Sequence, residues 1–180
     1  MTQHIIIIGF KSAGKSSIGK ILAKRLEYEF LDLDDEIIQW HEQKTGEKMT
    51  CRSMMKKYGD DYFRNLEHKV FGKMLATDRP KVLAVGGGTP MMNANRNIMK
   101  QHTVIHIDVP KEIIFERIMI NGKPAFFPDD RSPFQAFHEL WEERDPVFKK
   151  IASVTVENTG SVQDAVKRIL SRLPIQLKMT

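Results

Sequence analysis

A segment near the N-terminus has the residue types and spacing of a phosphate-binding loop. Four residues separate Gly9 from Gly14, and Lys15 and Ser16 come directly after the second glycine. In such a loop the backbone amides face a polyphosphate, the lysine reaches the outer phosphates, and the hydroxyl is offered to magnesium. The segment therefore predicts nucleotide binding in preference to a turn that only caps a helix. It leaves open whether the protein is a kinase, an ATPase or a GTPase.

Two carboxylates lie at the end of the second predicted strand. Asp32 and Asp34 stand two residues apart, and alternate residues of a strand share a face, so both could point towards the phosphate loop. One could hold magnesium through water, while the other accepts or orients the proton of an attacking hydroxyl group. We assign this second role to Asp34. The alternative is that Asp34 or Asp35 only caps the next helix.

Two arginines and a glycine triplet could hold the molecule that accepts a phosphoryl group. Arg64 could grip a carboxylate in a bidentate manner, with Glu67 holding the guanidinium in place. Arg144 could act in the same way, although most helical Arg and Glu side chains are solvated at the surface. A glycine triplet after a strand permits close approach of the backbone to a ligand, or forms only a tight turn. The triplet consists of Gly86, Gly87 and Gly88.

The elements that must position these residues alternate between strand and helix. Short apolar, β-branched runs predict strands over residues 4–8, 30–33, 82–85, 103–109 and 153–156. Helical spacing predicts helices over residues 15–26, 35–41, 50–58, 60–75, 91–100, 111–120, 134–150 and 161–173. This alternation predicts an α/β fold with a parallel sheet covered on both faces.

Ligands of such folds gather beyond the carboxyl ends of the strands, so Gly9, Asp32, Gly86 and Asp108 should lie at one edge of the sheet. Other residues mark the ends of helices. Gly59 should separate two helices, and Ser161 with Asp164 resembles a capping box. Residues 121–133, rich in Pro, Asp and Gly, predict a mobile loop.

Composition narrows the class of protein. The chain has 180 residues, of which 41% are hydrophobic and 28% charged, and this suits one globular domain over residues 1–180. Its longest apolar run, 5–8, is far too short to cross a membrane. The net charge of +5 is spread along the chain, so we expect anionic ligands but no nucleic-acid tail. A single cysteine, Cys51, fits a reducing cytoplasm.

These motifs together resemble the shikimate kinase family, within the nucleoside monophosphate kinase-like group of phosphate-loop proteins. The resemblance is carried by residues 9–17, 30–34, 63–67, 86–88 and 144–148. It implies transfer of the ATP γ-phosphoryl group to the 3-hydroxyl of shikimate, a cyclic polyol carboxylate on the route to chorismate and the aromatic amino acids. It also implies a three-layer sandwich of the phosphate-loop kinase fold, with sheet order 2-3-1-4-5.

The resemblance assigns a role to each site residue. Asp34 and the glycine triplet would hold the shikimate hydroxyls, and Arg64 and Arg144 would hold its carboxylate. Substrate-binding helices would span residues 34–76, and a lid would span residues 121–136. Asp32 with Ser16 would form the Mg²⁺ environment, and Arg117 would lie against the adenine. The residues implied to bind ATP are Ser12, Ala13, Gly14, Lys15, Ser16, Ser17, Arg117 and Lys123, and those implied to act in catalysis are Asp34, Lys15 and Lys123.

The chain departs from the family pattern at two places. The family usually has Arg-Pro in the lid, and this chain has Lys123 before Pro124. Lysine keeps a positive charge for the transferring phosphoryl group but lacks the planar fork of arginine, so Arg131 is an alternative for that contact. Phe148 stands where a tyrosine is common, so any hydroxyl contact there is lost.

Two other functions remain open from the sequence. A kinase of the same architecture could act on gluconate or on a nucleoside monophosphate, with the arginines gripping a different anion. A nucleotide-binding regulator without catalysis could retain the phosphate loop. In each case we expect ATP and Mg²⁺ as ligands, no membrane or nucleic-acid partner, and a monomer by default.

Overall fold

The centre of the protein is a five-stranded sheet in the order β2-β3-β1-β4-β5, with every neighbouring pair parallel. The computed structural model describes residues 2–120, 127 and 130–173. The strands are β1 (Ile5–Ile8), β2 (Glu29–Asp32), β3 (Lys81–Ala84), β4 (Thr103–Asp108) and β5 (Val154–Glu157). The predicted parallel sheet and the strand order implied by the resemblance are both confirmed.

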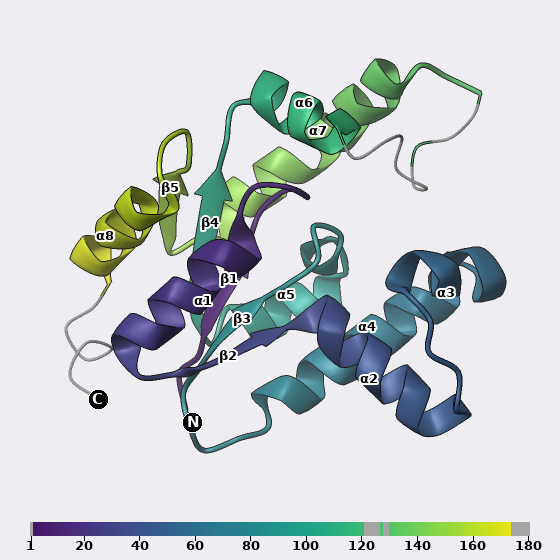
Figure 1. Ribbon diagram of the computed structural model, residues 1–180, viewed down its shortest axis with the longest axis horizontal. Coiled ribbons are helices and arrows are strands. Elements are labelled where there is room, and N and C mark those ends of the chain that lie inside the picture. Colours follow the sequence, from purple (N-terminus) through teal and green to yellow (C-terminus); the bar gives the residue numbers. More distant parts are fainter. Residues whose placement is uncertain (1, 121–126, 128–129, 174–180) are drawn as a thin grey trace.

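Helices lie on both faces of this sheet and make a three-layer α/β sandwich (Figure 1). They are α1 (Lys15–Leu26), α2 (Leu33–Thr45), α3 (Cys51–Tyr58), α4 (Asp60–Leu75), α5 (Asn93–Met99), α6 (Lys111–Ile120), α7 (Pro133–Ile151) and α8 (Val162–Arg172), with a short 3-10 helix, η1 (Thr89–Met91). Helices α1 and α8 pack together on one face, and α5 lies behind the sheet in Figure 1. Helices α2, α3 and α4 pack together to one side.

Strand β1 lies at the centre of the sheet and is completely buried. All four of its isoleucines, 5–8, have no exposed surface. The strand pairs with β3 on one side and β4 on the other. Such a strand must be apolar throughout, and β-branched side chains suit the pleated surface. Since Gly9 follows directly, the phosphate-loop candidate is anchored in the middle of the core.

Some boundaries differ from the sequence prediction for local reasons. Leu33 belongs to α2 and not to β2, because the side chain of Asp32 accepts a hydrogen bond from the backbone N–H of Asp34 and caps the helix. The helix predicted over residues 91–100 is divided, with η1 ending at Met91 and α5 beginning at Asn93.

Two other predicted helix ends are confirmed. Gly59 separates α3 from α4 as predicted, with a φ of 89° that favours glycine. Ser161 caps α8 by accepting from the backbone N–H of Asp164. A complete capping box joins Ser132 and Gln135 at the start of α7, where the sequence pattern indicated only a loop before residue 134.

Two further sequence predictions concern the lid and the lack of a membrane-spanning segment. Half of the predicted lid, residues 121–126 and 128–129, lies outside the described residues. No helix among the described residues is long and apolar enough to span a membrane.

The packing of α1 on the sheet gives a stability prediction. A Cβ atom at Gly19 would lie 2.4 Å from Cε2 of Phe30, so Gly19→Ala must displace a ring that packs against the core. We expect a loss of roughly 1–3 kcal/mol in the free energy of unfolding, measured by urea denaturation. Gly72→Ala in α4 is the matched control, because nothing lies within 4 Å of its added Cβ. It should stabilise the protein by about 0.5–1 kcal/mol. Equal effects of the two variants would contradict the steric argument.

Candidate active site

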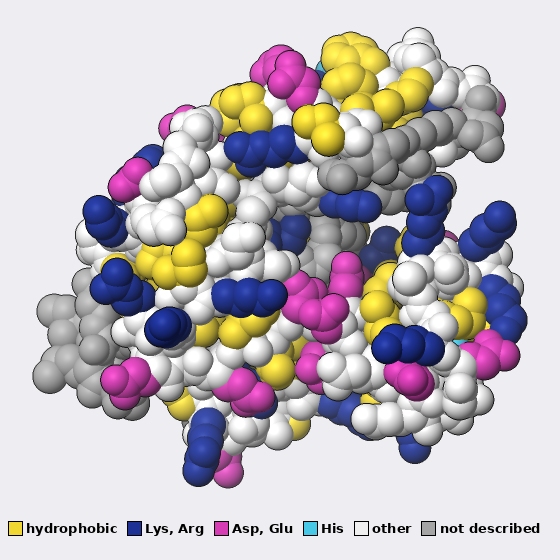
Figure 2. All heavy atoms as spheres, viewed as in Figure 1, with side chains coloured by type: hydrophobic (Ala, Val, Ile, Leu, Met, Phe, Trp, Pro, Cys, Tyr) yellow, Lys and Arg dark blue, Asp and Glu magenta, His cyan; other side chains and the backbone are white. Residues whose placement is uncertain are grey.

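A cleft of about 1030 Å³ lies at the carboxyl ends of the strands, where the sequence placed the ligand. Figure 2 shows the hollow, with Lys and Arg side chains gathered around its opening. Most of the predicted site residues line it. They are Ser12, Lys15, Ser16, Asp32, Asp34, Arg64, Gly86, Gly87, Gly88 and Arg144. Of the other predicted residues, Ala13, Gly14 and Ser17 belong to the phosphate loop and the start of α1, and Lys123 lies outside the described residues.

The phosphate loop is held in shape from the far edge of the sheet. Gly14 precedes α1 with a φ of 95°, in the left-handed region that favours glycine. The side-chain amide of Asn158, which follows β5, donates a 2.8 Å hydrogen bond to the carbonyl of Ala13. Asn158 is buried, and a Cβ at Gly14 would lie 2.7 Å from its Nδ2. The sequence analysis missed Asn158, although its place directly after a predicted strand was an available signal.

Lys15 lies under the loop with its ammonium facing protein oxygens. Its Nζ donates to the carbonyls of Phe10, at 2.8 Å, and Gly9, at 3.1 Å. Burial lowers the pKa of Lys15 to about 8, while the carboxylates of Asp34 and Asp32 act in the opposite direction. The group is therefore a cation at pH 7 that a polyphosphate can attract away from these carbonyls.

Asp32 connects α1 to α2. Its Oδ2 accepts a 2.5 Å hydrogen bond from the hydroxyl of Ser16, and its Oδ1 accepts from the backbone N–H of Asp34 at 3.1 Å. The prediction that Asp32 and Asp34 share a strand face is wrong, because Asp34 already lies in the first turn of α2. The alternative that Asp34 or Asp35 caps this helix is also wrong, since the cap is Asp32. Both carboxylates nevertheless line the cleft.

Asp34 combines solvent contact in the cleft with a largely protein surrounding. Burial raises the pKa of Asp34, the nearby Asp32 carboxylate raises it further, and Lys15 opposes both effects. A carboxylate with a raised pKa is a stronger proton acceptor when ionised, as a general base requires. The role of Asp34 as the proton acceptor stays a prediction.

A buried carboxylate fixes Arg64. One oxygen of Glu67 accepts from Nη1 of Arg64 at 2.8 Å, and the other accepts from the hydroxyl of Thr89 at 2.7 Å. Glu67 is only 1% exposed, so the reading of this residue as a solvated helix charge is wrong. A Cβ at Gly88 would lie 2.6 Å from two guanidinium nitrogens of Arg64. Only glycine leaves room for this arginine.

Arg144 enters the same cleft from α7. Burial lowers its pKa, and the positive charge of Arg64 lowers it further. Its Nε is buried and has no hydrogen-bond partner among the residues that the structure describes. Gly87 lies alongside, since a Cβ there would be 3.6 Å from Nη1 of Arg144. Two guanidinium groups that repel each other in one cleft make a site for an anion.

Three other residues named in the sequence analysis have different surroundings. Arg117 on α6 reaches the phosphate loop, where its Nη1 lies 3.4 Å from the carbonyl of Ser12. Phe148 has no exposed surface and contacts Phe10 and His106, so it belongs to the core behind the loop. Cys51 lines the cleft with its Sγ 3.6 Å from the carbonyl of Asp34. Burial, aided by the Asp34 carboxylate, raises the pKa of this thiol to about 12.

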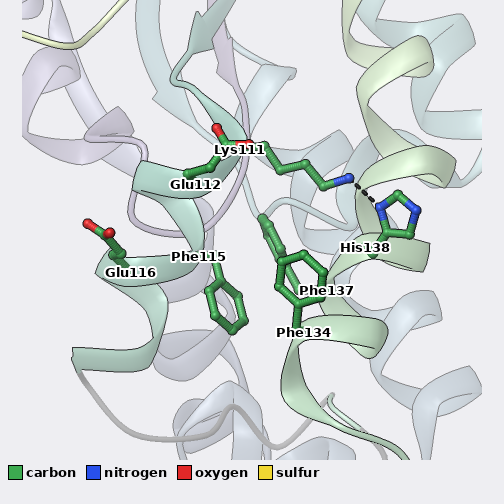
Figure 3. A pocket seen from close by; sticks show the side chains of 7 residues that line it. All are labelled: Lys111, Glu112, Phe115, Glu116, Phe134, Phe137 and His138. Carbon is green, nitrogen blue, oxygen red and sulfur yellow. Dashed lines mark hydrogen bonds between the residues drawn. The ribbon is translucent and has the colours of Figure 1, made fainter.

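A smaller cavity of about 280 Å³ lies between α6 and α7 (Figure 3). Its walls are mainly aromatic, and it contains none of the predicted site residues. The residues around it are Lys111, Glu112, Phe115, Glu116, Phe134, Phe137 and His138. The larger cleft is therefore the candidate active site.

Sequence comparison finds shikimate kinases that match nearly the whole chain. The family model for shikimate kinase matches residues 11–174. A shikimate kinase of Persephonella marina is 31% identical over 173 residues, covering 95% of this chain and 99% of the relative. One of Francisella tularensis subsp. novicida is 34% identical over 174 residues, covering 96% of this chain and 93% of the relative.

Structural comparison leads to the same group. A shikimate kinase from Acinetobacter baumannii, solved in complex with shikimate, has a TM-score of 0.82 and 31% identity, covering 100% of this chain and 97% of that chain. The shikimate kinase of Aquifex aeolicus has a TM-score of 0.78 and 29% identity, covering 94% and 95%. A gluconokinase from Sinorhizobium meliloti has a TM-score of 0.64 over 98% and 93%, but at 17% identity this shows a shared fold alone.

The charges around Lys15 give a prediction for the ligand-free protein. We expect its ammonium to lose its proton as the pH rises through about 8. Asp34→Asn should lower this pKa, because the Asp34 carboxylate is the strongest of the charges that favour the protonated form. The lysine Cε chemical shift, followed by NMR against pH, measures the value. Asp35→Asn is the control and should leave it unchanged. An unaltered Lys15 pKa in Asp34→Asn would contradict the assignment.

Proposed function

The chain belongs to the shikimate kinase family of ATP-dependent phosphotransferases, and from that membership we propose that it transfers the γ-phosphoryl group of ATP to the 3-hydroxyl of shikimate. The product would be shikimate 3-phosphate, in chorismate and aromatic amino acid biosynthesis. The observation that carries the proposal is the meeting of Arg64, Arg144 and Asp34 with the phosphate loop in one cleft. An acceptor that is both an anion and an alcohol needs this combination.

The donor side of the cleft binds ATP. The loop from Ser12 to Ser17 encloses the phosphates with its backbone amides and the start of α1. Lys15 leaves the carbonyls of Gly9 and Phe10 to contact the outer phosphates, where its charge stabilises the transferring group. Arg117, which already reaches the loop at Ser12, lies against the adenine.

On the acceptor side, charge and shape orient shikimate. Arg64, fixed by Glu67, and Arg144, whose Nε has no protein acceptor among the described residues, hold the carboxylate. The glycine triplet lets the ring hydroxyls approach the backbone. Asp34 then accepts, or at least orients, the proton of the attacking hydroxyl group. A negatively charged acceptor neutralises the two guanidinium groups, so the cleft favours an anionic acceptor over a neutral sugar.

Ser16 and Asp32 fit the Mg²⁺ that the family uses. A hydroxyl and a carboxylate oxygen 2.5 Å apart are the hard oxygen ligands that Mg²⁺ prefers, and the ion usually takes its remaining ligands from phosphates and water. When bound, Mg²⁺ neutralises charge on the phosphates. Asp32 also holds the start of α2, so the same residue keeps Asp34 in place.

A further cation for the transferring phosphoryl group would come from the lid, over residues 121–136. We assign it to Lys123 and not to Arg131. The guanidinium of Arg131 already pairs with Glu139 at 2.5 Å and with Asp130 at 3.2 Å. Closure over both substrates would exclude water, so that transfer outcompetes hydrolysis.

The single cysteine suits action in the cytoplasm, and we propose a monomer.

Magnesium-dependent ADP formation tests the proposal. The purified chain is given ATP with shikimate, gluconate, CMP or no acceptor, and any product is identified by mass. We expect shikimate phosphate at a rate well above the acceptor-free background. Turnover with another acceptor alone would replace the substrate assignment. Silence with every acceptor, in protein shown to bind ATP, would favour a regulator.

Asp34→Asn tests the acceptor-side chemistry. Removing the proton acceptor should lower kcat with shikimate by about 10²- to 10⁴-fold. In the parent protein kcat/KM should fall as the pH falls through the pKa of Asp34, at a higher pH than for an ordinary aspartate, because that pKa is raised. Asp35→Asn should retain the rate and shift the pH profile only slightly, because Asp35 is the weakest of the charges that raise the pKa of Asp34. Turnover by Asp34→Asn within tenfold of the parent would remove Asp34 from the mechanism.

A further inference from the structure

Helix α7 presents three aromatic side chains on the face that carries Arg144. Phe137, Trp141, Arg144 and Phe148 follow one another at intervals of four, three and four residues, which is the spacing of one helix face. Phe137 and Phe148 have no exposed surface. The residues of this aromatic face are therefore fixed by packing, and Arg144 is fixed with them.

Phe10 of the phosphate loop packs into this aromatic face. Its ring stacks on Trp141 with centroids 4.4 Å apart and the planes inclined by 4°. It meets Phe148 edge-to-face at 5.1 Å and Phe137 at 6.1 Å. Phe10 is only 4% exposed, so the loop is held by a buried aromatic cluster as well as by its own backbone.

The backbone of Phe10 serves the phosphate site at the same time. Its carbonyl accepts the 2.8 Å hydrogen bond from Nζ of Lys15. Displacing the ring would thus move the peptide group against which the lysine is placed. The loop also meets the glycine triplet nearby, because a Cβ at Gly87 would lie 3.3 Å from the carbonyl of Gly9 and 3.6 Å from Nη1 of Arg144.

Helix α7 also packs against α6. Figure 3 shows the side chain of Lys111 on α6 extending to His138 on α7. Lys111 also pairs with Glu142, and its Nζ lies 5.9 Å from the Trp141 ring centroid. The ring of Phe115 packs on that of Phe137 at 5.4 Å. Because α7 packs against both Phe10 and α6, it can fix the position of Arg144 relative to the loop.

We propose that Phe10 and Trp141 are positioning residues whose stacked rings set the phosphate loop in register with Arg144. The stack acts through Lys15 on the nucleotide side and through the placement of α7 on the acceptor side. Its acceptor role rests on the proposed function, whereas its nucleotide role does not. Arg144 would hold the acceptor by its carboxylate, so the position of Arg144 relative to the loop sets the distance between the donor phosphate and the acceptor. A displacement of about 1 Å between reacting groups can lower the rate on the order of 100-fold.

Trp141→Ala is the first test, with Trp141→Phe as the conservative variant and Trp40→Ala as the matched control. Trp40 is likewise half-buried on a helix with a lysine over its ring, Lys69 at 5.0 Å, but it lies on α2 and not on the helix that carries Arg144. Calorimetry with MgADP gives Kd without any acceptor. Steady-state assays with shikimate give kcat and the two KM values, and thermal unfolding gives stability.

We expect Trp141→Ala to raise the Kd of MgADP about three- to tenfold and to lower kcat about tenfold or more. Trp141→Phe, which can still stack, should restore both to within about twofold of the parent. Trp40→Ala, on a helix of the predicted substrate-binding segment, should lower the unfolding temperature and leave the Kd of MgADP unchanged. If Trp141→Ala likewise loses stability while its Kd and kcat stay unchanged, the residue is structural and the proposal is overturned. Because MgADP binding needs no acceptor, it remains informative even if shikimate proves not to be the substrate.

A double-mutant cycle covers the case in which Trp141→Ala does not fold. Phe10→Leu and Trp141→Leu keep apolar bulk but remove the stacked pair. If the rings act together, the two changes combined should weaken MgADP binding no more than the stronger single change does. Effects that simply multiply would show that the residues act independently and would overturn the proposal.

Discussion

The Asp32 carboxylate is the interaction on which the cleft depends. One oxygen caps α2 and the other accepts from Ser16 at the start of α1, so a single side chain joins the end of an edge strand to the phosphate loop and to the helix that carries Asp34. Neither helix terminus would have this partner without it. The position of the Asp34 carboxylate is therefore a consequence of how α2 begins.

The charges of the cleft are only partly balanced by the protein itself. Arg64 has a buried carboxylate partner in Glu67. The pKa of Arg144, in contrast, is lowered by burial and by the positive charge of Arg64. Lys15 and Asp34 each stand in surroundings that disfavour their charged forms and depend partly on each other. Phosphates on one side and a carboxylate on the other would supply the missing counter-charges. Under the proposed function, binding both substrates would therefore complete the balance of charge in the cleft.

Local sequence determined what could be predicted. The phosphate loop is contiguous, and the isoleucine run of β1 needs no information from elsewhere, so both were predicted from residue types alone. Asn158 bonds to Ala13 across 145 residues of chain, and Phe10 meets Trp141 only when α7 crosses behind the loop. Asp34 was predicted to enter the cleft, but for the wrong reason, because a side-chain cap turned the chain into a helix one residue before the predicted strand end. Contacts between distant segments are set by the fold, and the place of Asn158 directly after a strand indicates only the edge of the sheet at which it lies.

The protonated state of Cys51 has a consequence for chemical reactivity. With the pKa of the thiol raised to about 12, very little of the thiolate, the form that attacks peroxides and alkylating agents, is present at neutral pH. The chain's one cysteine lines its acceptor cleft and yet is almost inert as a nucleophile. Oxidation of this thiol should therefore be slow, and an electrophilic inhibitor aimed at this cleft would need a different anchoring residue.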